Sequence, residues 1–361
     1  MNKKTRFYEL HKLNNAKIVD FAGYEMPIQY SSIIAEHKAV RNSVGVFDVS
    51  HMGEVFIRGE KALDFVQHIT TNDASKLTPG RVQYSAMCYP DAGIVDDLLV
   101  YCIAEDEFML VVNASNLEKD FNWMNTNNSF DVQIVNESDE FSLLAVQGPE
   151  SKTVIQKITK EEINLEYYHF MKAEVAGVEM ILSRTGYTGE LGFELYFKGD
   201  EQVATTVWNA IFEAGKEFNV QPIGLGARDS LRLEMGFCLY GNDIDETTNP
   251  LEAGLGWITK LQKKSFIGKE AILKIKEDGL KRKLVPLLIE DKAFPRHGYE
   301  VVCNGKKVGT VTSGTVSPIL EKGIAMVYVE SEYAVEKNHL FILIRGKEVS
   351  AEVVRLPFLT R

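Results

Sequence analysis

Two stretches of this sequence read in register with each other and decide the expected fold: Gly59-Glu-Lys-Ala-Leu-Asp-Phe-Val-Gln-His-Ile-Thr70 and Gly148-Pro-Glu-Ser-Lys-Thr-Val-Ile-Gln-Lys-Ile-Thr159. Each follows an apolar run that is typical of a buried strand, Val55-Phe-Ile57 in the first and Leu143-Leu-Ala-Val146 in the second. In both, a glycine ends the strand and apolar residues then recur at helical spacing. The pattern predicts one strand–helix unit that is used twice.

The segments that follow each copy also correspond. After the first copy, the residue pattern predicts strands near 82–90, 94–103 and 107–112, a helix near 115–125 and a strand near 131–135. After the second copy, it predicts strands near 171–176, 178–184 and 192–197 and a helix over 201–214. Both of these helices carry a tryptophan, Trp123 and Trp208. The repeat predicts a duplicated ferredoxin-like region of the α+β class, with halves at about 46–140 and 141–235.

The composition changes after about Gly279. Short β-rich segments follow at 284–289, 299–303, 307–312, 324–329, 340–344 and 349–354, separated by turn residues such as Asn304-Gly305 and Arg345-Gly346. Short strands with this punctuation predict a small antiparallel β-barrel. We therefore expect one domain over 1–279 and a barrel domain over 280–361, with helix and loop at roughly 236–279 linking the two.

Composition and charge exclude several classes of function. The chain has 361 residues, of which 45% are hydrophobic and 25% charged, as in ordinary globular proteins of two or three domains. The formal net charge of −11 argues against non-specific binding to nucleic acid or anionic lipid. No apolar run approaches the roughly 18 residues of a membrane span, and the polar start Met1-Asn-Lys-Lys4 is unlike a secretory signal. We expect a cytoplasmic protein.

The spacing of cysteine and histidine gives no metal motif. Cys88, Cys102, Cys238 and Cys303 are far apart, which excludes a zinc finger or disulfide scaffold, and we expect four reduced, buried thiols. The seven histidines include no pair at metal-ligand spacing. The basic run Lys281-Arg-Lys283 is expected to lie on the solvated surface.

A first candidate for chemistry is the acid pair in Gly93-Ile-Val-Asp-Asp-Leu-Leu-Val-Tyr101. Alternation along a strand sends Asp96 and Asp97 to opposite faces, so only one of them can easily point into a pocket. A carboxylate on an otherwise apolar strand is costly to bury without a partner. The residues alone leave two interpretations open, a strand-edge or turn residue and a functional acid.

A second candidate is the glycine-rich segment Ser183-Arg-Thr-Gly-Tyr-Thr-Gly-Glu-Leu-Gly-Phe-Glu-Leu-Tyr196. Its glycines allow a sharp turn and a close approach of the backbone to a ligand. Tyr187 lies at the turn and Glu194 on the strand that leaves it. The segment lacks a Gly-Lys-Ser/Thr ending, so it is not a phosphate-binding P-loop. A glycine-rich hairpin with no further role is the other interpretation.

A third candidate is Gly224-Leu-Gly-Ala-Arg-Asp-Ser-Leu-Arg-Leu-Glu234, a predicted helix with Arg228 and Asp229 near its start. Arg228 and Arg232 share one helix face at i,i+4 spacing. The alternative interpretation is an amphipathic helix with a salt-bridged surface.

Taken together and in this order, the three segments resemble the glycine cleavage T-protein family. Phe21-Ala-Gly-Tyr-Glu-Met-Pro27 and Val46-Phe-Asp-Val-Ser-His-Met-Gly-Glu54 add two more family-like stretches, and the similarity runs from about residue 5 to the C-terminus. The family's fold is a duplicated ferredoxin-like folate-binding region followed by a β-barrel. One departure is Asp91-Ala-Gly93, where the family pattern has Gly-Gly, so Ala92 puts the conformation of that turn in question.

The resemblance implies an aminomethyltransferase of the glycine cleavage system. A partner, the H-protein, carries an aminomethyl group on its lipoyl arm. The enzyme transfers the methylene carbon to tetrahydrofolate and releases ammonia and dihydrolipoyl H-protein. Tetrahydrofolate is a co-substrate, and the resemblance implies no metal, flavin or nucleotide. We expect a monomer that meets the H-protein transiently.

The resemblance also implies roles for individual residues. Asp97 matches the family's catalytic acid near the folate nitrogens, where it would stabilise an iminium-like carbon and steer protons. Glu194 matches the carboxylate that grips the pterin. The other matches are folate-site positions: two aromatic residues around the pterin, an arginine, two positions near the pterin and an arginine expected to reach the folate tail. These are Tyr84, Tyr187, Arg228, Met52, Asn113 and Arg296.

The same fold hosts other functions. One rival is a folate-dependent demethylase of small methylated substrates. Another is a folate-binding accessory protein of RNA-modification or iron–sulfur pathways, which would carry a cysteine-bearing Lys-Gly-Cys-Tyr segment where this chain has Arg184-Thr-Gly-Tyr187. A folate domain of a larger flavoenzyme would need an N-terminal dinucleotide-binding unit, which this sequence lacks.

Overall fold

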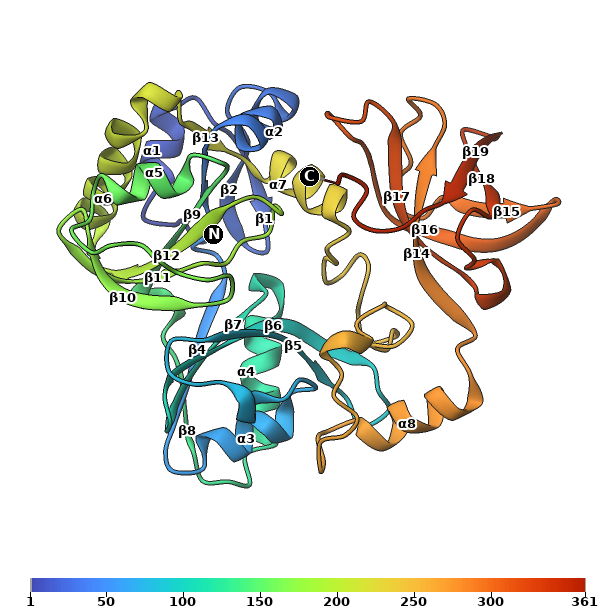
Figure 1. Ribbon diagram of the computed structural model, residues 1–361, viewed down its shortest axis with the longest axis horizontal. Helices are drawn as coiled ribbons and strands as arrows, with labels where there is room; N and C mark the ends of the chain where they lie inside the picture. The colour runs from blue at the N-terminus through green and yellow to red at the C-terminus, as the bar shows by residue number, and fades with distance from the viewer. Residues whose placement is uncertain (1, 361) are drawn as a thin grey trace. The chain divides into compact units, whose positions relative to one another are not determined.

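The computed structural model describes residues 2–360; Met1 and Arg361, the first and last residues of the expected domains, lie outside it. The chain forms two compact units that do not follow chain order. The first contains the chain up to Val66 together with Ala74–Gln83 and Leu98–Asp229. The second contains Gln67–Asp73, Tyr84–Asp97 and the chain from Ser230 onward. Each unit is described by itself below (Figure 1).

The first repeat builds a five-stranded sheet in the order β5-β6-β7-β4-β8. Its elements are β4 (Gly53–Arg58), α3 (Ala62–Ile69), β5 (Val82–Cys88), β6 (Ile94–Ala104), β7 (Glu107–Val112), α4 (Leu117–Thr126) and β8 (Gln133–Asn136). The tip formed by Tyr84–Asp97 belongs to the second unit. These elements follow the predicted order of strands and helices.

The second repeat builds a six-stranded sheet in the order β10-β11-β12-β9-β3-β13. Its elements are β9 (Phe141–Gln147), α5 (Ser151–Gln156), β10 (Phe170–Val175), β11 (Val178–Ser183), β12 (Gly192–Lys198), α6 (Glu201–Ala214) and β13 (Gln221–Ile223). The order matches that of the first sheet, except that β3 (Gly45–Asp48) is inserted between β9 and β13. Gly59 and Gly148 share a positive φ, 129° and 131°, which a residue with a side chain rarely adopts. The predicted repeat and the α+β class are confirmed.

The core of the second repeat lies between its sheet and its helices. Helix α6 buries Ala204, Val207, Trp208 and Ile211 at helical spacing, and these pack with apolar strand residues such as Leu144, Val146, Phe193 and Leu195. Asp200 caps the helix, since its Oδ1 accepts from the backbone N–H groups of Gln202 and Val203 at 3.0 Å. The chain's N-terminal elements are α1 (Tyr8–Leu13), β1 (Lys17–Phe21), β2 (Tyr24–Gln29) and α2 (Ile33–Asn42).

A closed barrel forms most of the second unit, in the order β14-β17-β16-β15-β18-β19. Its strands are β14 (Arg282–Ile289), β15 (Glu300–Cys303), β16 (Lys306–Val316), β17 (Gly323–Glu330), β18 (His339–Ile344) and β19 (Lys347–Val353). Asn304 and Gly305 have φ of 51° and 74°, and Arg345 and Gly346 have 52° and 77°. Two-residue turns with both φ values positive match the twist of flanking antiparallel strands. The predicted barrel and both hairpins are confirmed.

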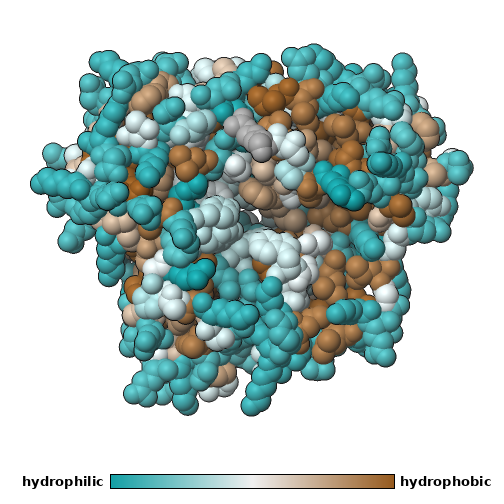
Figure 2. Space-filling view, viewed as in Figure 1, coloured by the Kyte–Doolittle hydropathy of each residue, from teal (hydrophilic) through white to brown (hydrophobic). Residues whose placement is uncertain are grey.

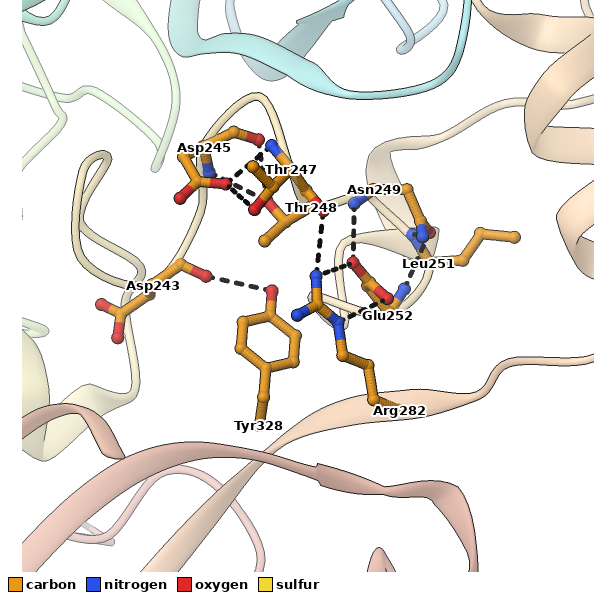
Figure 3. A network of polar contacts seen from close by, with 9 residues as sticks. All are labelled: Asp243, Asp245, Thr247, Thr248, Asn249, Leu251, Glu252, Arg282 and Tyr328. Carbon is orange, nitrogen blue, oxygen red and sulfur yellow. Dashed lines mark hydrogen bonds and ion pairs between the residues drawn. The ribbon is translucent and has the colours of Figure 1, made fainter. Parts of the chain in front are cut away.

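The segment before the barrel is held by polar contacts within the second unit. It contains α8 (Lys269–Asp278) and follows α7 (Leu225–Met235). Figure 3 shows Arg282 between Glu252, which accepts from its guanidinium at 3.0 Å, and the carbonyl oxygen of Thr247 at 2.9 Å. Tyr328 Oη donates to the carbonyl oxygen of Asp243 at 3.0 Å. Arg282 also lies over the Tyr328 ring, at 4.7 Å from its centroid.

A buried lysine fixes another part of this unit. Lys263 is 8% exposed, and its Nζ donates to the carbonyl oxygens of Gln67, Thr70 and Asn72 at 2.8, 2.6 and 2.7 Å. Three acceptors satisfy the three donors of an ammonium group. Lys263 therefore holds Gln67–Asp73 within the second unit.

Four local expectations need correction or completion. Arg282 is half-buried by the contacts above, so the run around it is not wholly solvated. Cys303 is also only half-buried, because it ends β15 at a hairpin, whereas the other three thiols are buried. Arg232, which the alternative interpretation of its helix placed on a salt-bridged surface, is 1% exposed and pairs with buried Asp243 at 2.7 Å. Ala92 takes the left-handed conformation, φ 80°, that the glycine of the family pattern would adopt more easily.

Hydrophilic side chains cover much of the face seen in Figure 2, and hydrophobic ones gather over the barrel. Among residues 2–360, no helix is long and apolar enough to cross a membrane. Within the same described range, no three His, Cys, Asp or Glu side chains are grouped closely enough to hold a metal ion.

Candidate functional site

The glycine-rich loop of the first unit folds around one buried side chain, Gln147. Its Nε2 donates to the carbonyl oxygen of Thr185 at 3.2 Å, and Thr188 Oγ1 donates to its Oε1 at 3.0 Å. A Cβ at Gly186 would lie 2.1 Å from Gln147 Oε1, and one at Gly192 would lie 2.3 Å from the same amide. A side chain at either position would therefore collide with the Gln147 amide, so both positions need glycine. These contacts with Gln147 fix the conformation of the loop, so it is more than a simple hairpin.

A buried arginine anchors the same loop. Arg41, 1% exposed, donates from Nη1 to the carbonyl oxygen of Thr188 at 2.6 Å and to Glu190 Oε1 at 2.7 Å. Charge-assisted bonds of this kind fix geometry more firmly than neutral ones. The two hydrogen bonds from Arg41 thus fix the position of the loop that carries Tyr187.

Glu194 lies at the start of β12 with two hydroxyl donors on one oxygen. Thr185 Oγ1 donates to its Oε2, and Tyr196 Oη donates to the same oxygen at 3.2 Å. Burial of the carboxyl group raises its pKa, while these two donors and the positive charge of Arg228 act to lower it. In this arrangement the Glu194 carboxyl group can accept hydrogen bonds from a ligand that carries several N–H groups.

Tyr101 connects the two sheets of the first unit at this point. Its Oη lies 3.1 Å from Ser183 Oγ, 3.2 Å from Thr185 Oγ1 and 3.0 Å from Tyr196 Oη. Burial raises the pKa of the Tyr101 and Tyr196 phenols, so both stay neutral donors and acceptors. The hydroxyl groups around Glu194 therefore form one connected network.

Tyr187 and Arg228 lie together in the first unit. The Arg228 guanidinium carbon is 4.4 Å from the Tyr187 ring centroid, and both side chains are partly exposed. A cation over an aromatic face is a favourable contact that also orients both groups. Met52 and Asn113 are half-buried in this unit, at the turn before β4 and at the residue after β7.

The second unit holds the other predicted residues. Tyr84 Oη donates to Asp97 Oδ2 at 2.8 Å, and the Tyr84 ring lies 5.9 Å from that of Trp257. Asp96 is fully buried, whereas Asp97 is half-buried on the opposite face of β6, as alternation predicts. Arg296 is exposed and lies 5.4 Å from the ring of Phe294.

Sequence reasoning missed several buried polar residues of the first unit. Tyr101, Thr185 and Tyr196 were not singled out, nor were His51 and Glu54, which are 2% and 1% exposed. Glu54 begins the apolar strand Val55-Phe-Ile57, and the argument applied to Asp97, that a carboxyl on a buried strand needs a reason, applies equally to it. That signal was available in the sequence.

Comparison with known proteins covers almost the whole chain. A family model described as GCVT N-terminal domain matches residues 7–263, and one described as Glycine cleavage T-protein C-terminal barrel domain matches residues 282–359. A relative named aminomethyltransferase from Halothermothrix orenii is 52% identical, with 99% of this chain and 100% of that protein covered. An aminomethyltransferase from Flavobacterium psychrophilum is also 52% identical, with 99% of each covered.

One solved structure is similar over its full length. The crystal structure of glycine cleavage system aminomethyltransferase T from Bartonella henselae has a TM-score of 0.93 and 34% sequence identity. The match covers 99% of this chain and 98% of that one.

Proposed function

Because the chain belongs to the glycine cleavage T-protein family of aminomethyltransferases, we propose that its one-carbon acceptor is tetrahydrofolate and its donor the lipoyl arm of the H-protein. In this reaction the aminomethyl carbon leaves sulfur and nitrogen and forms two bonds to the folate nitrogens. The products are 5,10-methylenetetrahydrofolate, ammonia and the dihydrolipoyl arm. The enzyme acts as a cytoplasmic monomer that meets the H-protein transiently.

The observation that carries this proposal is the environment of Glu194. Its Oε2 takes two hydroxyl donors, which leaves the other carboxyl oxygen for a ligand, and Arg228 supports the negative charge. The 2-amino-4-oxo ring of a reduced pterin offers neighbouring N–H donors that suit a carboxylate. Tyr187, oriented by Arg228, supplies an aromatic face for the same ring.

Asp97 would serve the transferred carbon rather than the pterin. A carboxylate stabilises an iminium-like carbon by its charge and can direct the protons that leave with ammonia. The Tyr84 hydroxyl donates to one Asp97 oxygen at 2.8 Å and so fixes the orientation of the group. Met52 and Asn113 are assigned to the pterin surroundings and Arg296 to the acidic tail of the folate.

The direct test is ammonia release from aminomethylated H-protein with and without tetrahydrofolate. We expect rapid release that requires both, and no release when the H-protein lacks its lipoyl group. Folate-independent release at the same rate would refute the proposed acceptor. Turnover of a small methylated amine in place of H-protein would instead indicate a demethylase.

A further inference from the structure

Glu54 is a buried carboxyl group with an oxygen that no side chain or backbone group satisfies. It lies on β4 and is 1% exposed, and its Oε1 has no hydrogen-bond partner among the described residues. A buried polar atom left in this way destabilises the folded protein. Such atoms in folded proteins call for a specific explanation, which includes a ligand that supplies the missing partner.

The strand register places Glu54 on the sheet surface that faces Glu194. Two residues along β4, and so on the same face, the Phe56 ring stacks on that of Phe141 at 5.9 Å and 19°. Phe141 shares its face of β9 with Ala145, and Ala145 is paired directly with Glu194 on β12. Glu54 and Glu194 therefore project from the facing surfaces of the two sheets in the first unit.

The row of paired residues next to Glu54 on the first sheet already contacts the second sheet, through a hydroxyl group at its end. Phe56 pairs with Met109, and Met109 pairs with Tyr101, whose hydroxyl group contacts Tyr196 on the other sheet at 3.0 Å. The row that contains Glu54 continues through Val111 to Leu99, and neither side chain can hydrogen-bond. The carboxyl group of Glu54 thus lies one row away from the hydroxyl network of Tyr101, and Val111 and Leu99 in its own row offer it no hydrogen bond.

The two carboxyl groups have contrasting surroundings. Burial raises the pKa of Glu194 as well, but Thr185 and Tyr196 donate to it and Arg228 adds a positive charge, so of the two it is the one that more readily carries the charge. Burial, and then the negative charge of Glu194, raise the pKa of Glu54 well above its usual range. The phenols of Tyr196 and Tyr24 also interact with Glu54, and burial raises the pKa values of both. Glu54 is therefore the neutral member of the pair.

We propose that Glu54 is a second ligand-binding carboxyl group of the folate site and acts as an uncharged acid beside the Glu194 carboxylate. This rests on the proposed function. A carboxylate can only accept hydrogen bonds, whereas the pterin ring carries a carbonyl acceptor next to its N–H donors. A neutral carboxylic acid offers one donor and one acceptor, so Glu54 can bind the carbonyl edge while its Oε1 accepts from a ring N–H.

The test compares tetrahydrofolate dissociation constants for three variants, measured anaerobically between about pH 6 and pH 9. Glu54→Gln keeps a neutral donor and acceptor, so it should bind within about threefold of the wild type. Glu54→Met should bind at least about tenfold more weakly, the effect of roughly one lost hydrogen bond. Wild-type affinity should fall on the alkaline side as Glu54 ionises, and Glu54→Gln should lose that fall.

Ser142→Ala is the matched control. Ser142 is 1% exposed and its hydroxyl group also has no partner among the described residues, but it lies on the face of β9 opposite Ala145. Its folate affinity should be unchanged. Glu54→Met binding as tightly as the wild type, or Glu54→Gln keeping the alkaline fall, would overturn the proposal; if Glu54→Met does not fold, the Glu54→Gln profile decides. Failure of the wild type to bind tetrahydrofolate would instead refute the proposed function itself.

Discussion

Replacing Tyr84 by phenylalanine removes one hydroxyl group and leaves its ring beside Trp257. That hydroxyl donates to Asp97 Oδ2 at 2.8 Å, and both residues are half-buried. A hydrogen bond to a charged group contributes about 1.5–3 kcal/mol, and partial exposure favours the lower end. About 1.5 kcal/mol corresponds to about a tenfold change in rate.

We therefore expect Tyr84→Phe to move the acidic limb of the pH–rate profile for ammonia release upward, because the carboxylate loses a donor that favours its charged form. The plateau rate should fall by about tenfold at most. Tyr240→Phe is the control, since the Tyr240 hydroxyl donates to the carbonyl oxygen of Ile94 at 3.1 Å in the same unit. Identical profiles for the wild type and both variants would refute the role given to Tyr84.

Two further predictions concern buried groups. Lys263→Met leaves three carbonyl oxygens without their donor, so the free energy of unfolding in a denaturant titration should fall by about 3 kcal/mol. The control, Lys264→Met at an exposed position, should stay within about 0.5 kcal/mol of the wild type. Equal unfolding free energies for the two variants would contradict the role given to Lys263. Burial lowers the pKa of His51 from 6.5 to about 4, so the unfolded chain binds a proton that the folded chain excludes. Stability should therefore fall by about 3 kcal/mol as pH drops through this window, and His51→Gln should lack that component; an equally steep fall in the variant would count against it.

The repeat and the barrel were predictable because local residues specify them. Gly59 and Gly148 need a backbone conformation that favours glycine, and each is followed by apolar residues at helical spacing. Asn304-Gly305 and Arg345-Gly346 specify tight hairpins without reference to the rest of the chain. Signals of this kind can be read one segment at a time.

Features that depend on distant segments were not predictable. Strand β3 enters the second sheet because Gly45–Phe47 pair in parallel with Gln221–Ile223, and no local pattern indicates a pairing across that separation. The burial of Arg232 could not be predicted, because helical spacing alone does not show that Asp243 and Ser313 accept from its guanidinium in the interior. Both outcomes are set by tertiary packing rather than by propensity.

The residues of the candidate site also include some that could be predicted and some that could not. Asp97 and Glu194 were found through the resemblance, and each has the hydroxyl donor that a useful carboxylate needs, Tyr84 for the first and Thr185 for the second. Glu54 was missed although its place on an apolar strand is visible in the sequence; the sequence does not show the facing strand that carries Glu194. A sequence shows the type of residue on a strand but not which group lies opposite it.

We propose that two carboxylates act separately, Glu194 in holding the folate and Asp97 in the carbon transfer. Tetrahydrofolate dissociation constants and single-turnover rates of ammonia release, measured side by side for Asp97→Asn and Glu194→Ala, test it most directly. We expect Asp97→Asn to bind folate within a few-fold of the wild type yet to react at least about 100-fold more slowly, and Glu194→Ala to bind folate at least about tenfold more weakly. Loss of folate binding in Asp97→Asn with unchanged binding in Glu194→Ala would contradict it.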